Sequence, residues 1–153
     1  MIMTTYEVST VINRPADIVV KALMNPDNFP YWQAGLERSE VVQGRPGEVD
    51  SVSRLHYSQR GNSYVREDRL VYCDPGRKYV SQVTGDALTA KVETILVSSG
   101  GRTEVTITWS GKAKALPLRF LLPLVKGKMV RQSKIELETF RELVETRGTD
   151  FSA

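Results

Sequence analysis

Apolar residues in the last third of the chain recur at steps of three and four residues. Between about Pro117 and Thr146 this spacing predicts one long amphipathic helix with a single buried face. At about 100° per residue, Ser133 falls near the middle of that face and Glu136 close to its edge. An unpaired buried carboxylate is very costly, so we predict that the helix covers a cavity containing water or a ligand. Alternatively, Glu136 lies at the solvent edge and Ser133 bonds back to the helix backbone. The apolar positions are Leu118, Leu122, Val125, Met129, Leu137, Phe140, Leu143 and Val144.

The N-terminal part of the chain predicts one strand followed by two short helices. Apolar and polar residues alternate from about Thr5 to Asn13, as in a half-buried strand. Pro15 suits the first position of a helix, because its φ angle is already close to the helical value. Asn25 and Pro26 then end this helix and begin a second one, since Asn is a good N-cap and Pro a good first residue.

The middle of the chain, from Leu36 to Lys112, predicts six strands separated by turn signals. The short connections imply antiparallel neighbours and a meander. We therefore expect an α+β fold in one domain over residues 1–153: a curved antiparallel sheet of about seven strands wrapped on the long C-terminal helix, with two short helices after strand one. The turn signals are Gly44-Arg45-Pro46-Gly47, Arg60-Gly61-Asn62, Asp74-Pro75-Gly76, Gly85-Asp86 and Gly100-Gly101.

Composition and charge narrow the functional classes. The 153 residues include 21 basic and 18 acidic ones, a formal net charge of +3, which is too weak a balance to imply a nucleic-acid partner. Cys73 is the only cysteine, so no internal disulfide is possible and a reducing compartment is suitable. We see neither a signal-peptide pattern nor an apolar stretch of about 18 residues. A cytoplasmic protein without stable membrane insertion is expected.

Several local sequences, taken in order with the long helix, carry a resemblance to a known family. They are Ile12-Asn13-Arg14-Pro15-Ala16-Asp17, Asn25-Pro26-Asp27 with Trp32, Gly44 with Pro46-Gly47, and the stretch from Leu70 to Lys78. The chain thereby resembles the START-related helix-grip superfamily, which includes polyketide cyclase/dehydrase and lipid-transport-like proteins. The resemblance implies an apolar cavity between the long helix and the concave sheet face, with a hydrophobic or amphipathic small molecule as ligand. It supplies no shared catalytic motif, and such a fold hosts many functions.

Candidate acid–base chemistry depends on His56, which is the only histidine, on the carboxylates or on the tyrosines. If Arg60 pairs with Ser63 across the Gly61-Asn62 turn, His56 faces Glu67 and both share a sheet face with Arg54. On the concave face these three side chains and Arg69 would form a polar cluster in the cavity wall. A one-residue slip would exchange the faces, and the opposite face is the more apolar one. The alternative is that His56 and Glu67 pair on the protein surface, where such a pair contributes little to stability. With one His and one Cys, we expect no metal site and no cofactor.

Other candidates for the cavity wall are aromatic or lie on the long helix. Trp109 should point inward, because apolar and polar residues alternate along the last strand, and the hydroxyl of Tyr79 could bond a ligand. Plain core packing is the alternative for each aromatic residue. The full expected ligand-binding set is Trp32, Arg54, His56, Glu67, Tyr79, Trp109, Met129, Ser133 and Glu136.

The apolar stretch from Ala115 to Leu124 has too many apolar residues for one buried face. It suggests a pocket lip, a contact in a possible homodimer, or an edge that touches a membrane, unless these residues pack under the preceding loop. Three functions remain open. The leading one is binding of a hydrophobic molecule of lipid, polyketide or aromatic type, for transport, sequestration or sensing. The others are a polyketide cyclase/aromatase-like enzyme that would use His56, Glu67 and Arg54, and a chaperone-interacting module.

Overall fold

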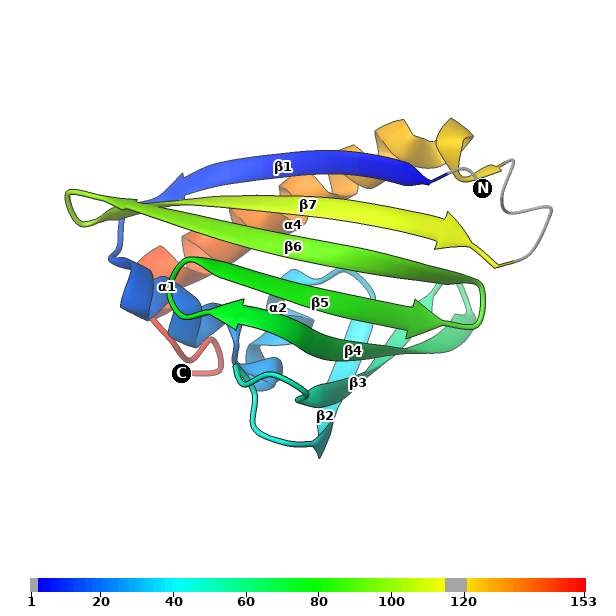
Figure 1. The fold of residues 1–153 in the computed structure, drawn as a ribbon, viewed down its shortest axis with the longest axis horizontal. Helices are drawn as coiled ribbons and strands as arrows, with labels where there is room; N and C mark the ends of the chain where they lie inside the picture. Colours follow the sequence, from blue (N-terminus) through cyan, green and yellow to red (C-terminus); the bar gives the residue numbers. More distant parts are fainter. Residues whose placement is uncertain (1–2, 115–120) are drawn as a thin grey trace.

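A seven-stranded antiparallel sheet forms the body of the protein in the computed structural model, which describes residues 3–114 and 121–153 (Figure 1). The strand order is β1-β7-β6-β5-β4-β3-β2, so the six later strands form a meander and β1 pairs with β7. This confirms the predicted sheet and its six strands between Leu36 and Lys112. The strands are β1 (Thr4–Ile12), β2 (Leu36–Gln43), β3 (Val52–Gln59), β4 (Asn62–Asp74), β5 (Lys78–Gly85), β6 (Leu88–Ser99) and β7 (Arg102–Ala113).

Short helices follow β1, as predicted. They are α1 (Ala16–Leu23), the 3-10 helix η1 (Pro26–Asn28) and α2 (Phe29–Trp32). Pro15 is the N-cap of α1, and the side chain of Asn25 caps η1 by accepting a hydrogen bond of 3.1 Å from the Asp27 backbone N–H. Such a cap satisfies a donor that has no partner within the helix.

The long helix α4 (Lys126–Arg147) runs diagonally across one face of the sheet, behind β1, β7 and β6 in Figure 1. It follows the short 3-10 helix η2 (Pro123–Val125). The predicted helix began at about Pro117, and residues 115–120 lie outside the described part of the chain. No helix in the described part is long and apolar enough to span a membrane.

The main core lies between α1, α4 and the concave sheet face. Phe140 of α4 is at its centre, with ring centroids 5.1 Å from Trp32 and 5.7 Å from Phe151. The buried residues of α4 are Leu137, Phe140 and Val144, which belong to the predicted apolar face. A second cluster of Leu36, Leu55 and Tyr57 lies towards the β2 edge, where Phe29 and Tyr64 pack against it.

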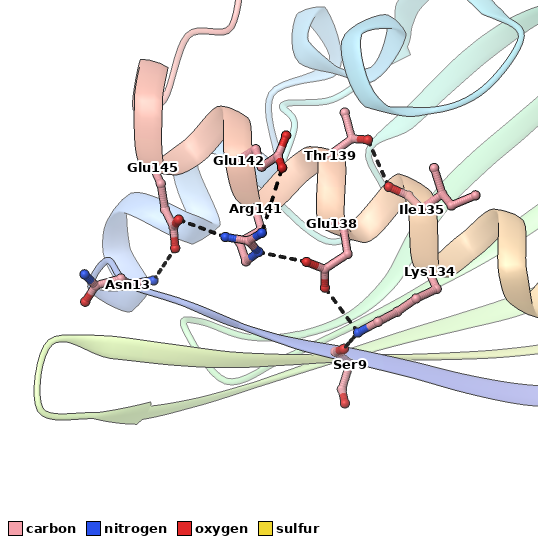
Figure 2. A network of polar contacts seen from close by, with 9 residues as sticks. All are labelled: Ser9, Asn13, Lys134, Ile135, Glu138, Thr139, Arg141, Glu142 and Glu145. Atoms are coloured by element: carbon pink, nitrogen blue, oxygen red, sulfur yellow. Dashed lines mark hydrogen bonds and ion pairs between the residues drawn. The ribbon is translucent and has the colours of Figure 1, made fainter.

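Polar contacts fasten one side of α4 to β1 (Figure 2). Glu138 forms ion pairs with Lys134 at 3.2 Å and with Arg141 at 2.9 Å, and Lys134 also donates a hydrogen bond to the Ser9 carbonyl. Hydrogen bonds from Thr10, Arg141 and Lys134 lower the pKa of Glu138 to about 2. Arg141 also pairs with Glu145 at 3.0 Å. The contacts with Ser9 and Thr10 hold this side of α4 against β1, and the ion pairs within the helix order the side chains that make them.

Candidate ligand-binding cavity

A cavity of about 130 Å³ lies between the concave sheet face and the short helices that follow β1. Its floor comes from neighbouring strands, and Ser53 of β3 is directly opposite Asp68 of β4. Pro46, Gly47, Ser51 and Leu70 complete the lining. The helices contribute Leu23, Met24, Pro26, Phe29, Trp32 and Gln33, and the floor contains Ser53, Asp68, Ser81, Val92, Thr94 and Ile107.

The position of this cavity differs from the predicted one. None of its described lining residues belongs to α4, because Leu137, Phe140 and Val144 fill the space between that helix and the sheet. The void lies instead beside α4, under α1, η1 and α2. Trp32 connects the two regions, since it lines the cavity and packs its ring on Phe140.

Asp68 is the distinctive polar group of the cavity. Protein atoms surround its carboxyl group, and the cavity leaves part of the side chain accessible. This burial raises the pKa of Asp68 to about 6, although a hydrogen bond with Ser81 acts in the opposite direction. Asp68 was not among the predicted site residues, because it stands in the charged run Arg66-Glu67-Asp68-Arg69, which is typical of a solvent-exposed strand.

Replacing Asp68 with Asn is expected to stabilise the protein at neutral pH. The folded-state pKa of about 6 exceeds the usual 3.8, so the carboxylate destabilises the fold above pH 6 and this cost disappears below pH 3.8. We expect a gain in the free energy of unfolding on the order of 2 kcal/mol at pH 7.5. Urea unfolding at pH 7.5 and pH 4 measures it, with Glu67→Gln as the control on the opposite sheet face. Equal stability of both variants at pH 7.5 would contradict the burial of Asp68.

The polar groups of α4 that led to the cavity prediction have protein partners. Ser133 Oγ lies 2.6 Å from the hydroxyl of Tyr6, whose ring stacks on Trp109 with centroids 5.4 Å apart. Glu136 accepts hydrogen bonds from the Ala34 N–H at 3.0 Å and from Gln132. Burial raises the pKa of Tyr6 and that of Glu136. Ser133 and Glu136 therefore lie where α4 contacts the rest of the protein, and each is hydrogen-bonded to a protein group.

A second hollow, a groove of about 320 Å³, opens on the outer side of the cavity. It runs between α4 and the segment from Pro30 to Gly35, and Glu136 and Ile135 are on its α4 side. Trp32 and Gln33 line both the groove and the inner cavity, so the two spaces are adjacent. Gln33 is held by the hydroxyl of Tyr57 at 3.1 Å, whereas the buried indole N–H of Trp32 has no hydrogen-bond partner among the described residues.

The predicted register of the hairpin between β3 and β4 is wrong. Gln59 pairs with Asn62, so Arg54 is opposite Glu67 and His56 is opposite Val65. The turn therefore lies at Arg60-Gly61, whose φ angles of 52° and 79° suit a two-residue hairpin loop.

The predicted inward orientation of Arg54, His56 and Glu67 is also wrong. Leu55 and Tyr57, which alternate with them on β3, are buried in the second cluster. His56 Nε2 lies 2.9 Å from a carboxylate oxygen of Glu40, and Arg54 lies 3.4 Å from Glu67. The three residues thus form a polar group on the convex face with Glu40, whose pKa is lowered mainly by its hydrogen bond with His56.

The remaining predicted site residues have varied positions. Trp32 lines the cavity. Trp109 points inward, and its ring lies over Gly111, where a Cβ atom would come within 2.2 Å of the indole. The hydroxyl of Tyr79 accepts a hydrogen bond of 3.0 Å from the Gly76 N–H, and Met129 is partly buried near the start of α4. Most of the predicted apolar lip, residues 115–120, lies outside the described residues, and Leu124 after it is 79% exposed.

Comparisons with known proteins identify relatives over nearly the whole chain. A family model described as "Polyketide cyclase / dehydrase and lipid transport" matches residues 3–145. No curated protein matches the sequence at a significant level. Among solved structures, the Zhui aromatase/cyclase from Streptomyces sp. R1128 is 20% identical, with a TM-score of 0.75 over 95% of this chain and 96% of that one.

Two further structures have the same fold. A START superfamily protein from Mycobacterium smegmatis is 16% identical, with a TM-score of 0.71 over 90% of this chain and 97% of that one. A protein from Thermus thermophilus is 17% identical, with a TM-score of 0.72 over 91% and 95% of the two chains. At such identities the likeness establishes the helix-grip fold.

Proposed function

The chain belongs to the polyketide cyclase/dehydrase and lipid transport family, and we propose on this premise that it binds a small hydrophobic or amphipathic molecule in the cavity beneath α1, η1 and α2. The observation that carries the proposal is the lining of that cavity. Apolar and aromatic side chains of the helices face a floor with a few polar groups, among them Ser53, Asp68 and Ser81. This combination is typical of small-molecule sites, where apolar surface gives affinity and a few polar groups give orientation.

The volume limits the size of the ligand. A cavity of about 150 Å³ with apolar walls can hold benzene, and the cavity here measures about 130 Å³. The enclosed part of the ligand should therefore have the size of one six-membered ring or a short aliphatic chain. A longer molecule would extend beyond the cavity, and the groove that shares Trp32 and Gln33 with it is the adjacent space.

Catalysis is a second candidate function, supported by Asp68. A general acid or base works best when its pKa is close to the operating pH, and burial raises the pKa of Asp68 to about 6 within the cavity. The proposed catalytic group for a cyclase-like reaction is therefore Asp68. His56 lies on the convex face, so a His56→Ala variant is expected to retain any such activity.

Narrowing the cavity should weaken ligand binding. Val92 of β6 lines the cavity, and a Val92→Phe substitution would place an aromatic ring in it. We expect this variant to bind ring-sized probes at least tenfold more weakly than the wild type, because the ring occupies the space of the ligand. Toluene, benzyl alcohol and benzylamine are suitable probes, and saturation-transfer NMR measures their binding.

Val97→Phe is the matched control for this substitution. Val97 lies on the same strand, is 54% exposed, and points away from the concave face. This variant should bind the probes as the wild type does. If no probe binds the wild type, or if Val92→Phe binds the probes unchanged, the cavity is not the binding site.

A further inference from the structure

The lining of the cavity contains a negatively charged group and no positively charged one among the described residues. Asp68 is the only charged residue among the described residues that line it, and none of them is Lys, Arg or His. The floor otherwise has hydroxyl groups, namely Ser53 opposite Asp68 and Ser81, which bonds to its carboxylate. An ionised carboxylate has room for about four hydrogen bonds. The cavity therefore presents an anionic acceptor whose capacity the surrounding hydroxyls do not fill.

The arginines near Asp68 have other partners. Arg66 lies over the rings of Tyr57 and Tyr64, with its guanidinium carbon 5.2 and 5.1 Å from their centroids. Arg54 pairs with Glu40 and Glu67 on the convex face, and Arg69 lies 3.8 Å from Asp50. Buried charges in proteins are normally paired or neutralised, and no cation among the described lining residues pairs with Asp68, so a cation supplied by a ligand would complete the site.

We propose that the ligand is a small organic cation, an amine attached to an apolar ring or chain, whose ammonium group pairs with Asp68. This inference rests on the proposed function and names its ligand class. The ammonium would lie against Asp68 and the hydroxyls of the floor, while the apolar part contacts the helix wall. Phe29 and Trp32 meet edge to face in that wall, with centroids 6.3 Å apart. Aromatic rings add a further attraction for a cation that is partly desolvated.

The groups around Asp68 predict a simple pH dependence. Ser53 on β3 and Ser81 on β5 do not titrate near neutral pH, and burial raises the pKa of Tyr57 further above its usual value. Glu136 of α4 borders the outer groove, and its pKa is also raised by burial. Amine binding should thus weaken below neutral pH as Asp68 takes up a proton, and substitution of Asp68 should remove this dependence.

Two isosteric probes test the inference. Benzylamine is a cation at pH 5.0 and 7.5, and benzyl alcohol is its neutral counterpart of nearly equal size. By isothermal titration calorimetry at pH 7.5, we expect the wild type to bind benzylamine at least tenfold more tightly than benzyl alcohol. At pH 5.0 the affinity for benzylamine should fall about tenfold, because only about a tenth of a carboxyl group with a pKa near 6 is then ionised. The affinity for benzyl alcohol should change much less.

Two variants on adjacent residues provide the control. Asp68→Asn and Glu67→Gln remove the same charge, but only Asp68 lines the cavity, while Glu67 is exposed on the convex face. Asp68→Asn should lose both the preference for benzylamine and its pH dependence, and Glu67→Gln should keep both. Equal binding of the two probes by the wild type, or a preference that survives in Asp68→Asn, would overturn the cation inference and leave the cavity function standing. If neither probe binds the wild type, both the cation inference and the proposed binding function of the cavity are overturned.

Discussion

A Phe140→Ala variant is expected to lose about 3–5 kcal/mol of its free energy of unfolding, the usual cost of removing a buried aromatic side chain. Phe140 is 0% exposed, and its ring lies against Trp32 and Phe151. The substitution would leave a void between α4, α2 and the C-terminal segment, three elements that can close it only by moving together. Urea unfolding followed by tryptophan fluorescence measures the loss.

Ile135→Ala on the same helix is the control for this prediction. Ile135 is 60% exposed, and surface substitutions usually change stability by less than about 0.5 kcal/mol. A loss below about 1 kcal/mol for Phe140→Ala would show that the space between α4 and the sheet is not tightly packed. In that case the cavity would extend under α4, where the sequence first suggested it.

An Asn28→Ala variant should be the next most destabilised, by about 3 kcal/mol, because it leaves several buried backbone groups without partners. Asn28 is 1% exposed. Its side-chain amide donates to the carbonyls of Ala22 at 3.0 Å and Thr149 at 2.8 Å, and its oxygen accepts from the Phe151 N–H at 2.9 Å. One side chain thus joins the end of α1 to the C-terminal segment that covers Phe140.

Hydrogen exchange distinguishes this role from a general loss of stability. In Asn28→Ala the Phe151 amide should exchange faster than amides in the centre of β6, because it loses its acceptor directly. Asn62→Ala, at the exposed start of β4, should change neither the unfolding free energy nor the exchange of Phe151. Unaltered protection of the Phe151 amide in Asn28→Ala would show that the C-terminal segment is held by other contacts.

The sheet and its order were predictable because their signals are local. Turn residues separate the strands, and short connections leave antiparallel pairing as the simple solution. The short helices were likewise marked by Pro15 and by the Asn25-Pro26 pair, which stand at their starts in the structure. The long helix was predictable from its apolar spacing, and the buried residues Leu137, Phe140 and Val144 belong to that pattern.

The hairpin between β3 and β4 shows where local signals are insufficient. Non-glycine residues seldom adopt a positive φ angle, so the sequence favoured a turn at Gly61-Asn62. Arg60 nevertheless takes a φ of 52° beside Gly61, and the register differs from the predicted one. In the same segment the sequence does not determine which strand face is buried, because charged and aromatic residues alternate in it. Only the packing of Leu55 and Tyr57 determines that His56 points outward.

The candidate site could not be predicted for a related reason. Asp68 is buried by residues that lie far from it in the sequence, namely the helices between residues 16 and 32 and the neighbouring strands. Its own neighbours, Glu67 and Arg69, are exposed. One signal was present: Arg66, Asp68 and Leu70 share a strand face, and Leu70 marks that face as the inner one. Ser133 and Glu136 lie on the inward side of α4, as their spacing predicted, but they bond to Tyr6 and to the Ala34 backbone and do not line the inner cavity.

The most direct test of the cavity as a binding site is a titration of the ¹⁵N-labelled protein with benzylamine, followed by two-dimensional amide spectra. We expect saturable shifts at the amides of Ser53, Asp68, Ser81 and Val92, which lie on neighbouring strands around the cavity floor. The amides of His56 and Val97, whose side chains point away from it, should change less. Saturable shifts centred on the convex face, or none at millimolar probe, would contradict the account.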